Sequence, residues 1–474
     1  MRRSPWATLT VLALAQFIVV LDVTIVNVAL PDIQRDLGFT TDGLQWVISA
    51  YTLLFGGFLL LGGRASDLFG SRRVFVTGLV LFGATSLAGG LAPSPGWLIA
   101  ARAVQGLGGA LLSPAALSIL TVTFEHGRRR TIAMGVWGGL AGLGGTLGVV
   151  AGGVLVDSAS WRWVFIVNVP IVVALVAVTP LFVRPFTPHA DQRGFDLLGA
   201  VLGTGGLLAV VYGVVRAEPV GWSSAEVIGC LAAGAVLLAA FVAVEARAAA
   251  PLVPLGLLRS RALSTAGGAL ALNGAAFLSM FFLTAIFLQQ VRGGSALRAG
   301  VEFLPMGGAA IAAAVATTPL VSRFGTRSIQ VVGAVLNVVA LLLLARAGAH
   351  GSYVTGMMPG LMLFGVGIIV VSVPAQIAAV AEVKPREAGA ASGVVSAFYQ
   401  VGGALGLAVV TTLSTSRTNA VAGGGGSPVD ALVAGYHRGL IVAAVFAAAT
   451  TVVTALAPRV APTPEQIASG AVPA

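Results

Sequence analysis

Long apolar segments follow one another along nearly the whole chain of 474 residues, separated by short polar connections. A helix needs about 20 predominantly apolar residues to cross the hydrocarbon core of a bilayer. By this measure we predict fourteen membrane-crossing helices, at residues 8–31, 44–63, 74–92, 97–121, 131–156, 162–183, 196–215, 223–244, 262–288, 301–320, 328–347, 354–374, 389–413 and 437–457. An even number places both termini on the same side of the membrane.

The composition agrees with this pattern. Hydrophobic residues make up 57% of the chain and charged residues only 9%, whereas soluble domains carry about 25% charged residues. So few charges cannot cover a water-facing surface, and we therefore expect an all-α integral membrane protein. The single cysteine, Cys230, excludes an internal disulfide bond and a cluster of thiolate ligands. We predict neither a metal site nor a cofactor.

The basic residues are distributed unequally between the two sets of connections. With a cytoplasmic N-terminus, the cytoplasmic segments contain 18 of the 27 basic residues and the external segments 8, while Arg102 lies inside a span. Cytoplasmic loops of membrane proteins carry an excess of Arg and Lys. The net charge of +10 is explained by basic loops beside an anionic leaflet rather than by nucleic-acid binding. Arginine supplies every basic residue except Lys384, a bias typical of high-GC bacteria, so we predict a multi-pass protein of a bacterial cytoplasmic (inner) membrane with both termini inside.

An internal repeat divides the chain. "DLFGSRRVF" at residues 67–75 reappears as "SRFGTRSI" at residues 322–329, with Phe, Gly and Arg aligned at an offset of 255. Both copies fall between the second and third predicted helices of a half. We therefore predict a six-helix bundle (residues 1–185), two inserted helices (186–250), a second six-helix bundle (251–458) and a cytoplasmic tail (459–474). Two repeats with a cavity between them are a transporter architecture.

Five stretches of the first half carry a family resemblance. They are "LDVTIVNVALP" (21–31), "GRASDLFGSRR" (63–73), "RAVQGLGGALLSP" (102–114), "GGTLGVVAGG" (144–153) and "WRWVFIVNVP" (161–170). In these stretches the chain resembles the fourteen-helix drug:proton antiporter branch of the major facilitator superfamily. The resemblance implies the major facilitator fold and export of small molecules in exchange for protons.

The first connection with many charges is predicted to be a latch. The resemblance implies that this loop holds the two bundles together on the cytoplasmic side when the transporter opens outward. Its residues are Gly63, Asp67, Gly70, Arg72 and Arg73. The glycines permit tight turns, and the Asp67 carboxylate can pair with an arginine or a helix N-terminus. The alternative for the arginines is that they are ordinary cytoplasmic-side charges.

Two charges lie within apolar segments. A charged carboxylate near the centre of a membrane helix costs about 2.5–3.5 kcal/mol on insertion scales, so it rarely occurs there without a function. We predict that Asp22 carries a proton and, from the resemblance, that Arg102 couples protonation to substrate exchange. The alternatives are a structural carboxylate near the interface and an arginine that extends to the nearest interface.

Glycines in the fifth predicted helix indicate close helix packing. They are Gly144, Gly148, Gly152 and Gly153, in the stretch that resembles the antiporter motif of the family. This chain has Val149 where the family motif usually has proline. The close packing is expected to persist, whereas a proline kink is not.

The predicted substrate cavity is uncharged. Its expected lining residues are Gln105, Asn273, Phe277, Met280, Phe281, Tyr399 and Gln400. Aromatic and methionine side chains suit bulky lipophilic ligands of several shapes. The alternative is that these stripes are helix–helix contacts.

These features together predict a proton-coupled exporter of lipophilic small molecules, such as drugs or antibiotics, acting as a monomer by alternating access. The alternatives are an exporter of one native metabolite and an importer or uniporter of the same fold. A P-loop requires lysine before Ser or Thr, and the sole lysine, Lys384, precedes Pro385, which disfavours an ATP-driven pump. No clustered His, Asp or Glu site within the apolar segments indicates an enzyme.

Overall fold

The computed structural model describes residues 4–124, 129, 133, 136, 147–184, 196–248, 251, 255–381, 383 and 388–458. In the first half these form α1 (Pro5–Leu37), α2 (Thr41–Leu44), α3 (Trp46–Phe69), α4 (Ser71–Gly90), α5 (Pro95–Thr123), the helical segment Leu147–Ser158, α7 (Trp163–Ile166) and α8 (Asn168–Phe182). The inserted pair is α9 (Leu197–Val220) and α10 (Ala225–Glu245). The second half contains η1 (Leu257–Arg259), α11 (Arg261–Ile286), the π-helix η2 (Phe287–Val291), α12 (Ala296–Phe324), α13 (Thr326–Leu344), α14 (Tyr353–Gly356), α15 (Met358–Ala381), α16 (Ala388–Gly423) and α17 (Pro428–Ala455).

The predicted fold class is confirmed. Among the described residues, twelve helices are long and apolar enough to cross a membrane, and two shorter apolar helices, Trp46–Leu59 and Leu147–Ser158, accompany them. Twelve of the fourteen predicted segments thus correspond to helices of sufficient length, and the predicted segments 44–63 and 131–156 overlap the two shorter ones, so the count of fourteen crossings stays a prediction. The first part of the predicted helix at residues 131–156 falls largely outside the described residues.

Serine hydroxyls mark the start of several long helices. In α5, α10, α11, α12 and α17 the residue before the helix is a serine whose Oγ accepts a backbone N–H of the first turn; these serines are Ser94, Ser224, Ser260, Ser295 and Ser427. Each such cap satisfies one of the N–H groups that a helix start leaves without a partner. The polar connections seen in the sequence therefore determine where the apolar helices begin.

The repeat of 255 residues is present in the backbone as well as in the sequence. Gly70, between α3 and α4, has φ 89°, and Gly325, between α12 and α13, has φ 78°. Glycine is the residue that adopts such angles without steric cost. The preceding phenylalanines are exposed to a similar extent, Phe69 by 56% and Phe324 by 53%. The two halves thus turn their second and third long helices in the same way.

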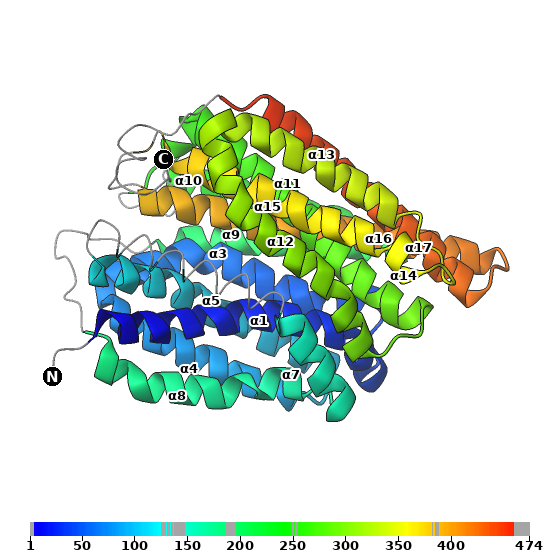
Figure 1. The fold of residues 1–474 in the computed structure, drawn as a ribbon, viewed down its shortest axis with the longest axis horizontal. Coiled ribbons are helices and arrows are strands. Elements are labelled where there is room, and N and C mark those ends of the chain that lie inside the picture. Colours follow the sequence, from blue (N-terminus) through cyan, green and yellow to red (C-terminus); the bar gives the residue numbers. More distant parts are fainter. Residues whose placement is uncertain are drawn as a thin grey trace.

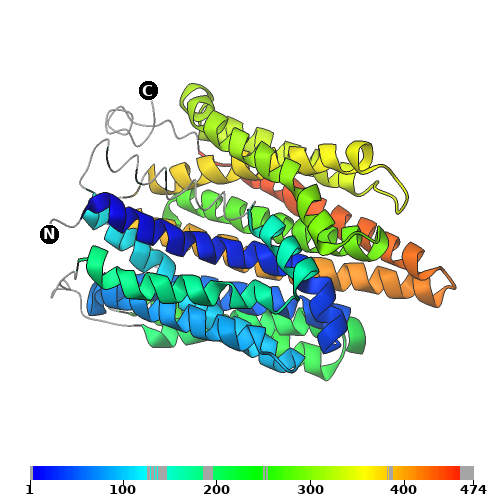
Figure 2. The same cartoon turned by 60° about the horizontal axis from the view of Figure 1, so that its bottom comes forward.

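The helices run roughly along the long axis of the molecule (Figures 1 and 2), and α1 begins at the same end at which α17 finishes. We call this the terminal end, and the opposite end, where α1 finishes and α3 begins, the far end. In Figure 1 the first half (blue to cyan) lies below the second half (green-yellow to red).

Among the described residues, the main apolar core that the two halves share lies toward the far end. One cluster of buried residues joins Ile25 and Phe165 of the first half to Phe281 and Leu440 of the second. Toward the terminal end the buried clusters are separate, because one contains residues of the first half alone and another residues of α11, α15 and α16 alone. The described halves are therefore packed together at the far end and separate toward the terminal end.

Polar contacts reinforce the far-end contact. Gln289 of η2 donates to the Val28 carbonyl oxygen at 3.0 Å, and Gln290 donates to Gln34 at 2.8 Å. The backbone N–H of Leu297 donates to Asp157 Oδ2 at 3.1 Å, which places a carboxylate on the N-terminus of α12. Every one of these bonds crosses from one half to the other.

Candidate functional site: a buried ion pair in the first half

Asp22 and Arg102 form an ion pair inside the first half. Asp22 lies in the middle of α1 and is 0% exposed, while Arg102 lies in α5 and is 1% exposed. Arg102 Nη1 donates to Asp22 Oδ2 at 2.5 Å. Each of the two intramembrane charges singled out in the sequence is therefore the partner of the other. The Arg102 guanidinium is therefore paired with a buried carboxylate and does not extend to the membrane interface.

Gln105 closes the ion pair into a ring. It lies one turn after Arg102 on α5, accepts from Arg102 Nη1 at 2.8 Å and donates to Asp22 Oδ1 at 2.8 Å. We expected Gln105 in a substrate cavity, but the structure places its side chain within this buried cluster, at 0% exposure. Its amide group thus contacts both charges at once.

Helix α3 supplies two further partners of the guanidinium. Arg102 Nε donates to the Val47 carbonyl oxygen at 3.0 Å, and the Cζ atom lies 4.2 Å from the centre of the Tyr51 ring. A guanidinium over an aromatic face gains attraction from the ring quadrupole. Close approach of α3 and α5 makes this possible, because a Cβ atom at Gly106 would clash with the Tyr51 carbonyl group.

Two further residues, Asn168 and Ser86, complete the cluster. Asn168 of α8 donates from Nδ2 to Asp22 Oδ1 at 3.1 Å and to Ser86 Oγ at 3.0 Å. Ser86 of α4 also accepts from Gln105 at 3.2 Å and donates to the Phe165 carbonyl oxygen at 2.9 Å. Residues of α1, α3, α4, α5 and α8 therefore form this one cluster. Sequence reasoning missed both residues, although Asn168 lies within the stretch "WRWVFIVNVP" that carries the resemblance.

The hydrogen bonds of the cluster suit an ionised carboxylate. Asp22 accepts from Arg102 at Oδ2 and from two amide groups at Oδ1, and an ionised carboxylate is an acceptor only. A proton on either oxygen removes the acceptor of at least one of these donors. Since burial penalises an unpaired charge strongly, a change in the protonation of Asp22 changes which contacts Arg102 can keep.

Glycines of the helical segment Leu147–Ser158 allow it to pack closely against α1 beside this carboxylate. A Cβ at Gly148 would clash with Thr24 and lie 3.0 Å from the Leu21 carbonyl oxygen, and a Cβ at Gly152 would lie 2.9 Å from the Ile25 carbonyl oxygen. Gly153 faces the second half, because a Cβ at this position would lie 2.8 Å from the Ala296 carbonyl oxygen. Gly144 lies outside the described residues. The glycines that are described hold α1 on one side and α12 on the other.

The second half has no copy of this ion pair at the repeat positions. An offset of 255 places Phe277 opposite Asp22, Met357 opposite Arg102 and Leu341 opposite Ser86. The polar residues of the second half form a neutral cluster instead, in which Asn337 donates to Asn273 at 3.1 Å and Asn273 donates to Ser372 at 3.0 Å. Among the described residues, the repeat is thus symmetric in backbone and asymmetric in charge.

The residues expected to line the cavity of the second half lie in two environments. Asn273, Met280 and Phe281 are buried, and the Phe281 ring stacks on Phe303 at a centroid distance of 4.5 Å. Phe277, Tyr399 and Gln400 are half-buried. A Cβ at Gly56 of α3 would lie 2.8 Å from Gln400 Cβ, so Gln400 sits where the two halves meet.

The predicted latch residues lie at the terminal end. Gly70 has the left-handed backbone that joins α3 to α4, Gly63 packs beside Pro114, Arg72 is half-buried and Arg73 is exposed. The Asp67 side chain lies outside the described residues, although its backbone belongs to α3. Ser71, directly after Gly70, is hydrogen-bonded to Ser118 of α5 at 2.8 Å, which fixes the turn to the first half.

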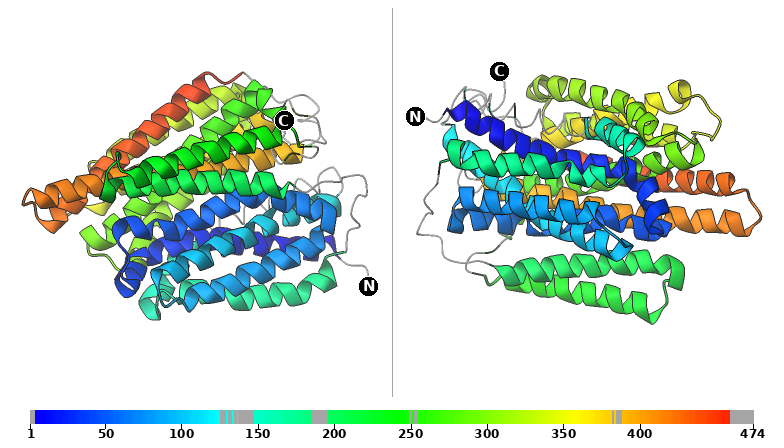
Figure 3. Two further views of the ribbon diagram at one scale, coloured as in Figure 1. Left: turned by 180° about the vertical axis from the view of Figure 1, so that it is seen from behind. Right: turned by 90° about the horizontal axis from the view of Figure 1, so that it is seen from below.

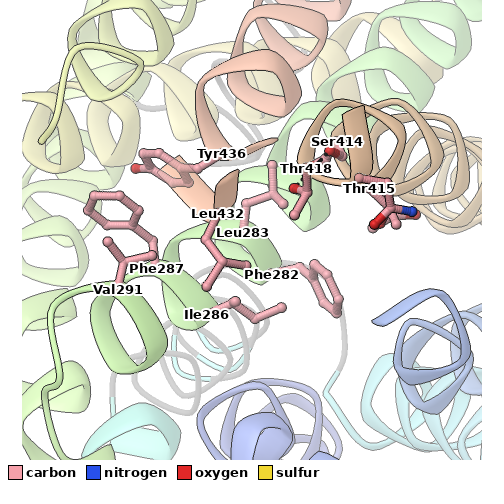
Figure 4. Close-up of a pocket in the computed structure, with 12 residues that line it drawn as sticks. Phe282, Leu283, Ile286, Phe287, Val291, Ser414, Thr415, Thr418, Leu432 and Tyr436 are labelled. Atoms are coloured by element: carbon pink, nitrogen blue, oxygen red, sulfur yellow. Dashed lines mark hydrogen bonds between the residues drawn. The ribbon is translucent and has the colours of Figure 1, made fainter. Parts of the chain in front are cut away.

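A pocket occupies the far end of the second half (Figure 4). Aromatic and aliphatic side chains of α11 and η2, among them Phe282, Ile286 and Phe287, form one wall, and hydroxyl groups of α16 form a second wall. Leu432 and Tyr436 of α17 complete the lining. Thr411 belongs to this second wall and also donates to Gln45 Oε1 of the first half. The pocket lining contains no charged residue.

A helical membrane protein built of two repeated halves around an off-centre buried ion pair belongs to the class of membrane transporters. The family is shown by comparison of sequences. Residues 12–407 match the Major Facilitator Superfamily. The chain belongs to this superfamily, and the predicted resemblance is confirmed.

The relatives of the chain include proteins named for antibiotic resistance and antibiotic export. The chain is 42% identical over 460 residues to the "Puromycin resistance protein pur8" of Streptomyces alboniger, covering 95% of this chain and 90% of that one. It is 38% identical to the "Cephamycin export protein CmcT" of Amycolatopsis lactamdurans (94% and 91% covered) and 35% identical to the "Tetracenomycin C resistance and export protein" of Streptomyces glaucescens (89% and 78%).

Solved structures share the fold. A bacterial homologue of the human lysosomal transporter Spinster, in an inward-facing and unoccupied conformation, superposes with a TM-score of 0.70 at 15% identity, covering 96% of this chain and 97% of that one. A peptide transporter of the POT family reaches a TM-score of 0.68 at 16% identity (96% and 98% covered). The protein is thus a multi-pass membrane transporter of the major facilitator fold.

Proposed function

We propose that this protein exports lipophilic, antibiotic-like molecules from a bacterial cell in exchange for protons, by alternating access. The observation that carries the proposal is the fully buried ion pair of Asp22 and Arg102. A carboxylate at this depth is costly, so it rarely occurs without a function, and proton transfer is a common function of such residues. The names of the relatives, each an antibiotic exporter or resistance protein, support the substrate class.

The terminal end is proposed to face the cytoplasm. The positive connection with Arg64, Arg72 and Arg73 lies at this end, and basic residues favour the cytoplasmic side. In this orientation the described halves are packed together on the external side and separate on the internal side. This is the arrangement expected of a transporter that receives its substrate from the cell.

Protonation of Asp22 is proposed to drive the change between states. With Asp22 ionised, Arg102 is held between α1 and α5 by the ion pair. A proton neutralises Asp22, so Arg102 loses its anion and keeps the Val47 carbonyl oxygen, Gln105 and the aromatic rings of Tyr51 and Phe165 as partners. Since ionised and neutral forms then favour different packing of α1, proton binding shifts the populations of the two conformations.

Helix α1 connects this site to the external contact. The same helix carries Asp22 and, two turns further on, the Val28 carbonyl group that accepts from Gln289 of η2. A displacement of α1 therefore acts on the contact between the halves as well as on the carboxylate. Substrate is proposed to bind between the halves near Phe277, Tyr399 and Gln400. The loop of Gly63, Asp67, Gly70, Arg72 and Arg73 is proposed to latch the cytoplasmic side in the outward-open state.

Proton coupling is tested in inverted membrane vesicles with an imposed pH gradient and a fluorescent lipophilic dye. Wild-type protein is expected to accumulate the dye and to release protons when dye is added. Asp22→Asn fixes a neutral side chain of the same shape, so it is expected to bind dye and to exchange it only passively. Dye-induced proton release that persists in Asp22→Asn contradicts the proposal for Asp22.

A further inference from the structure

The two inserted helices lie along the line where the two halves meet. Seen from behind, α9 and α10 (green) run between the blue helices of the first half and the orange and red helices of the second (Figure 3, left). Helix α9 contacts α3 of the first half and α16 of the second. The inserted pair is therefore not a detached appendage, and α9 is the helix that contacts both halves.

The contact between α9 and α3 is an interlocked one. A Cβ at Gly57 of α3 would lie 3.1 Å from Thr204 Cβ, so the Thr204 side chain of α9 occupies the notch that this glycine leaves. Closer to the terminal end, Ala200 and Leu61 form a buried cluster of their own, against which Phe58 packs. This cluster contains residues of α3 and α9 alone. Helix α9 thus stays against the first half where the second half has separated from it.

The contact between α9 and α16 is of a different kind and lies nearer the far end. Val211 and Val215 of α9 pack with Ala404 and Ala408 of α16, together with Leu53 of α3. The Thr412 hydroxyl group donates to the Val214 carbonyl oxygen at 3.3 Å, at the long end of the usual range. Alanine faces let helices approach closely without interlocking side chains. Such a surface can separate and close again as a whole.

We propose that α9 and α10 are a fixed part of the first half and that α16 moves against α9 during transport. In this proposal the pair covers the line of contact between α3 and α16 throughout the transport cycle, and α10 faces the lipid. Outward opening separates the far-end contact of α16 with α9 and preserves the Gly57–Thr204 contact. The inference rests on the proposed alternating access.

The burial of α10 agrees with this position. The apolar side chains of Ile228, Val236 and Val242 are exposed on α10, as expected for a helix that faces lipid. Its contact with α9 is close, since a Cβ at Gly206 would lie 2.8 Å from Leu238 Cγ. The pair therefore moves as one unit, and its attachment to the rest of the molecule depends on α9.

Two disulfide bonds test the proposal in a Cys230→Ser parent, which removes the single native cysteine. Gly57→Cys with Thr204→Cys joins α9 to α3, and Val214→Cys with Thr412→Cys joins α9 to α16. Transport of a fluorescent dye is measured in inverted vesicles before oxidation, after oxidation and after reduction, with the four single-cysteine variants as controls. Mass spectrometry measures the yield of each bond.

The α9–α3 bond is expected to leave transport within about twofold of the unoxidised protein, because no movement occurs there. The α9–α16 bond is expected to lower transport by about tenfold or more, with recovery on reduction, because it blocks a required conformational step. Transport that survives a complete α9–α16 bond, or that is lost with the α9–α3 bond, overturns the proposal. The proposed proton coupling is read separately, from the dependence of the parent's dye uptake on the pH gradient.

Discussion

The Arg102 guanidinium lies between the Asp22 carboxylate, 2.5 Å from Nη1, and the face of the Tyr51 ring, 4.2 Å from Cζ. The charge of α5 is thus held by an anion on α1 and an aromatic ring on α3. Neither contact depends on water, because both side chains of the ion pair are buried. Because Arg102 contacts both Asp22 and Tyr51, the loss of any one of these three side chains changes the contacts of the others.

The first prediction concerns the stability of the ion pair. Arg102→Leu leaves the Asp22 carboxylate buried without its cation, and we expect it to lower the free energy of unfolding by about 3–5 kcal/mol. The double variant Asp22→Leu with Arg102→Leu removes both charges and should recover most of this loss. Thermal unfolding in detergent measures both. If the single and double variants are equally destabilised, this prediction is wrong.

The second prediction concerns the role of Asn168 in coupling. Asn168→Leu removes one N–H donor from Asp22 Oδ1. Gln105 then remains as the amide donor described on that oxygen, so the carboxylate is held less firmly and fewer protons should be released for each dye molecule transported. The charged and titratable groups described around Asp22 are Arg102 on α5 and Tyr51 on α3, and both are unchanged in this variant.

Proton release and dye transport are measured together in inverted vesicles, with Asn27→Leu as the matched control. Asn27 is a buried amide on the same helix as Asp22, and its Nδ2 donates to the Val23 carbonyl oxygen instead of to Asp22. A merely structural role of Asn168 would lower dye transport and proton release in the same proportion. An unchanged ratio of protons to dye therefore counts against its role as a positioning residue.

The third prediction concerns the packing of α1. Gly148→Val places side-chain atoms against Thr24 and the Leu21 carbonyl group, one turn or less from Asp22. We expect a loss of about 1–3 kcal/mol of stability from overpacking and reduced transport. Gly308→Val is the control, because no heavy atom lies within 4 Å of a Cβ there. If the two variants unfold at the same temperature, the close approach is unimportant.

The fourth prediction concerns the loop between α3 and α4. Asp67→Asn preserves size and removes the charge, so the proposed cytoplasmic latch should weaken. Efflux should fall while the amount of protein in the membrane stays the same. Gly96→Ala at the start of α5, where a Cβ would meet no atom within 4 Å, serves as the control. Unchanged efflux in Asp67→Asn leaves this residue with a role in topology alone.

The fifth prediction concerns orientation. Reporter fusions after residues 130 and 474 should be active in the cytoplasm, and one after residue 222, between α9 and α10, should be active outside. The excess of basic residues in the cytoplasmic connections is the reason. A C-terminal reporter that is active outside contradicts both the helix count and the proposed direction of transport.

The sequence predicted the helices well because each apolar segment is long enough to identify by itself. It also identified Asp22 and Arg102, since a charge inside such a segment is conspicuous. It could not predict that they pair, because they lie 80 residues apart and helical phase alone does not say which face of α1 meets α5. Asn168 and Ser86 were missed for a related reason, since neutral polar residues are common in membrane helices.

Met280 and Phe281 illustrate a second limit. A stripe of large apolar residues on one helix face packs equally well into a core or along a cavity, and both residues proved to be buried in the contact between the halves. Half-exposed neighbours such as Phe277 and Gln400 could be distinguished from them only once the helices were placed. The periodicity of the sequence identifies which helix face is apolar, whereas the tertiary structure determines what that face packs against.

The restriction of the charged cluster to one half has an electrical consequence. At the repeat positions the second half carries Phe277 and Met357, so the described cluster offers one carboxyl group to the proton. A carrier that exchanges one proton for one neutral molecule moves a net positive charge inward in each cycle, and the membrane voltage contributes about 2.3 kcal/mol per 100 mV. Exchange for a monovalent cation moves no net charge. Export of neutral substrates through this site should therefore respond to voltage as well as to pH, and export of monocations to pH alone.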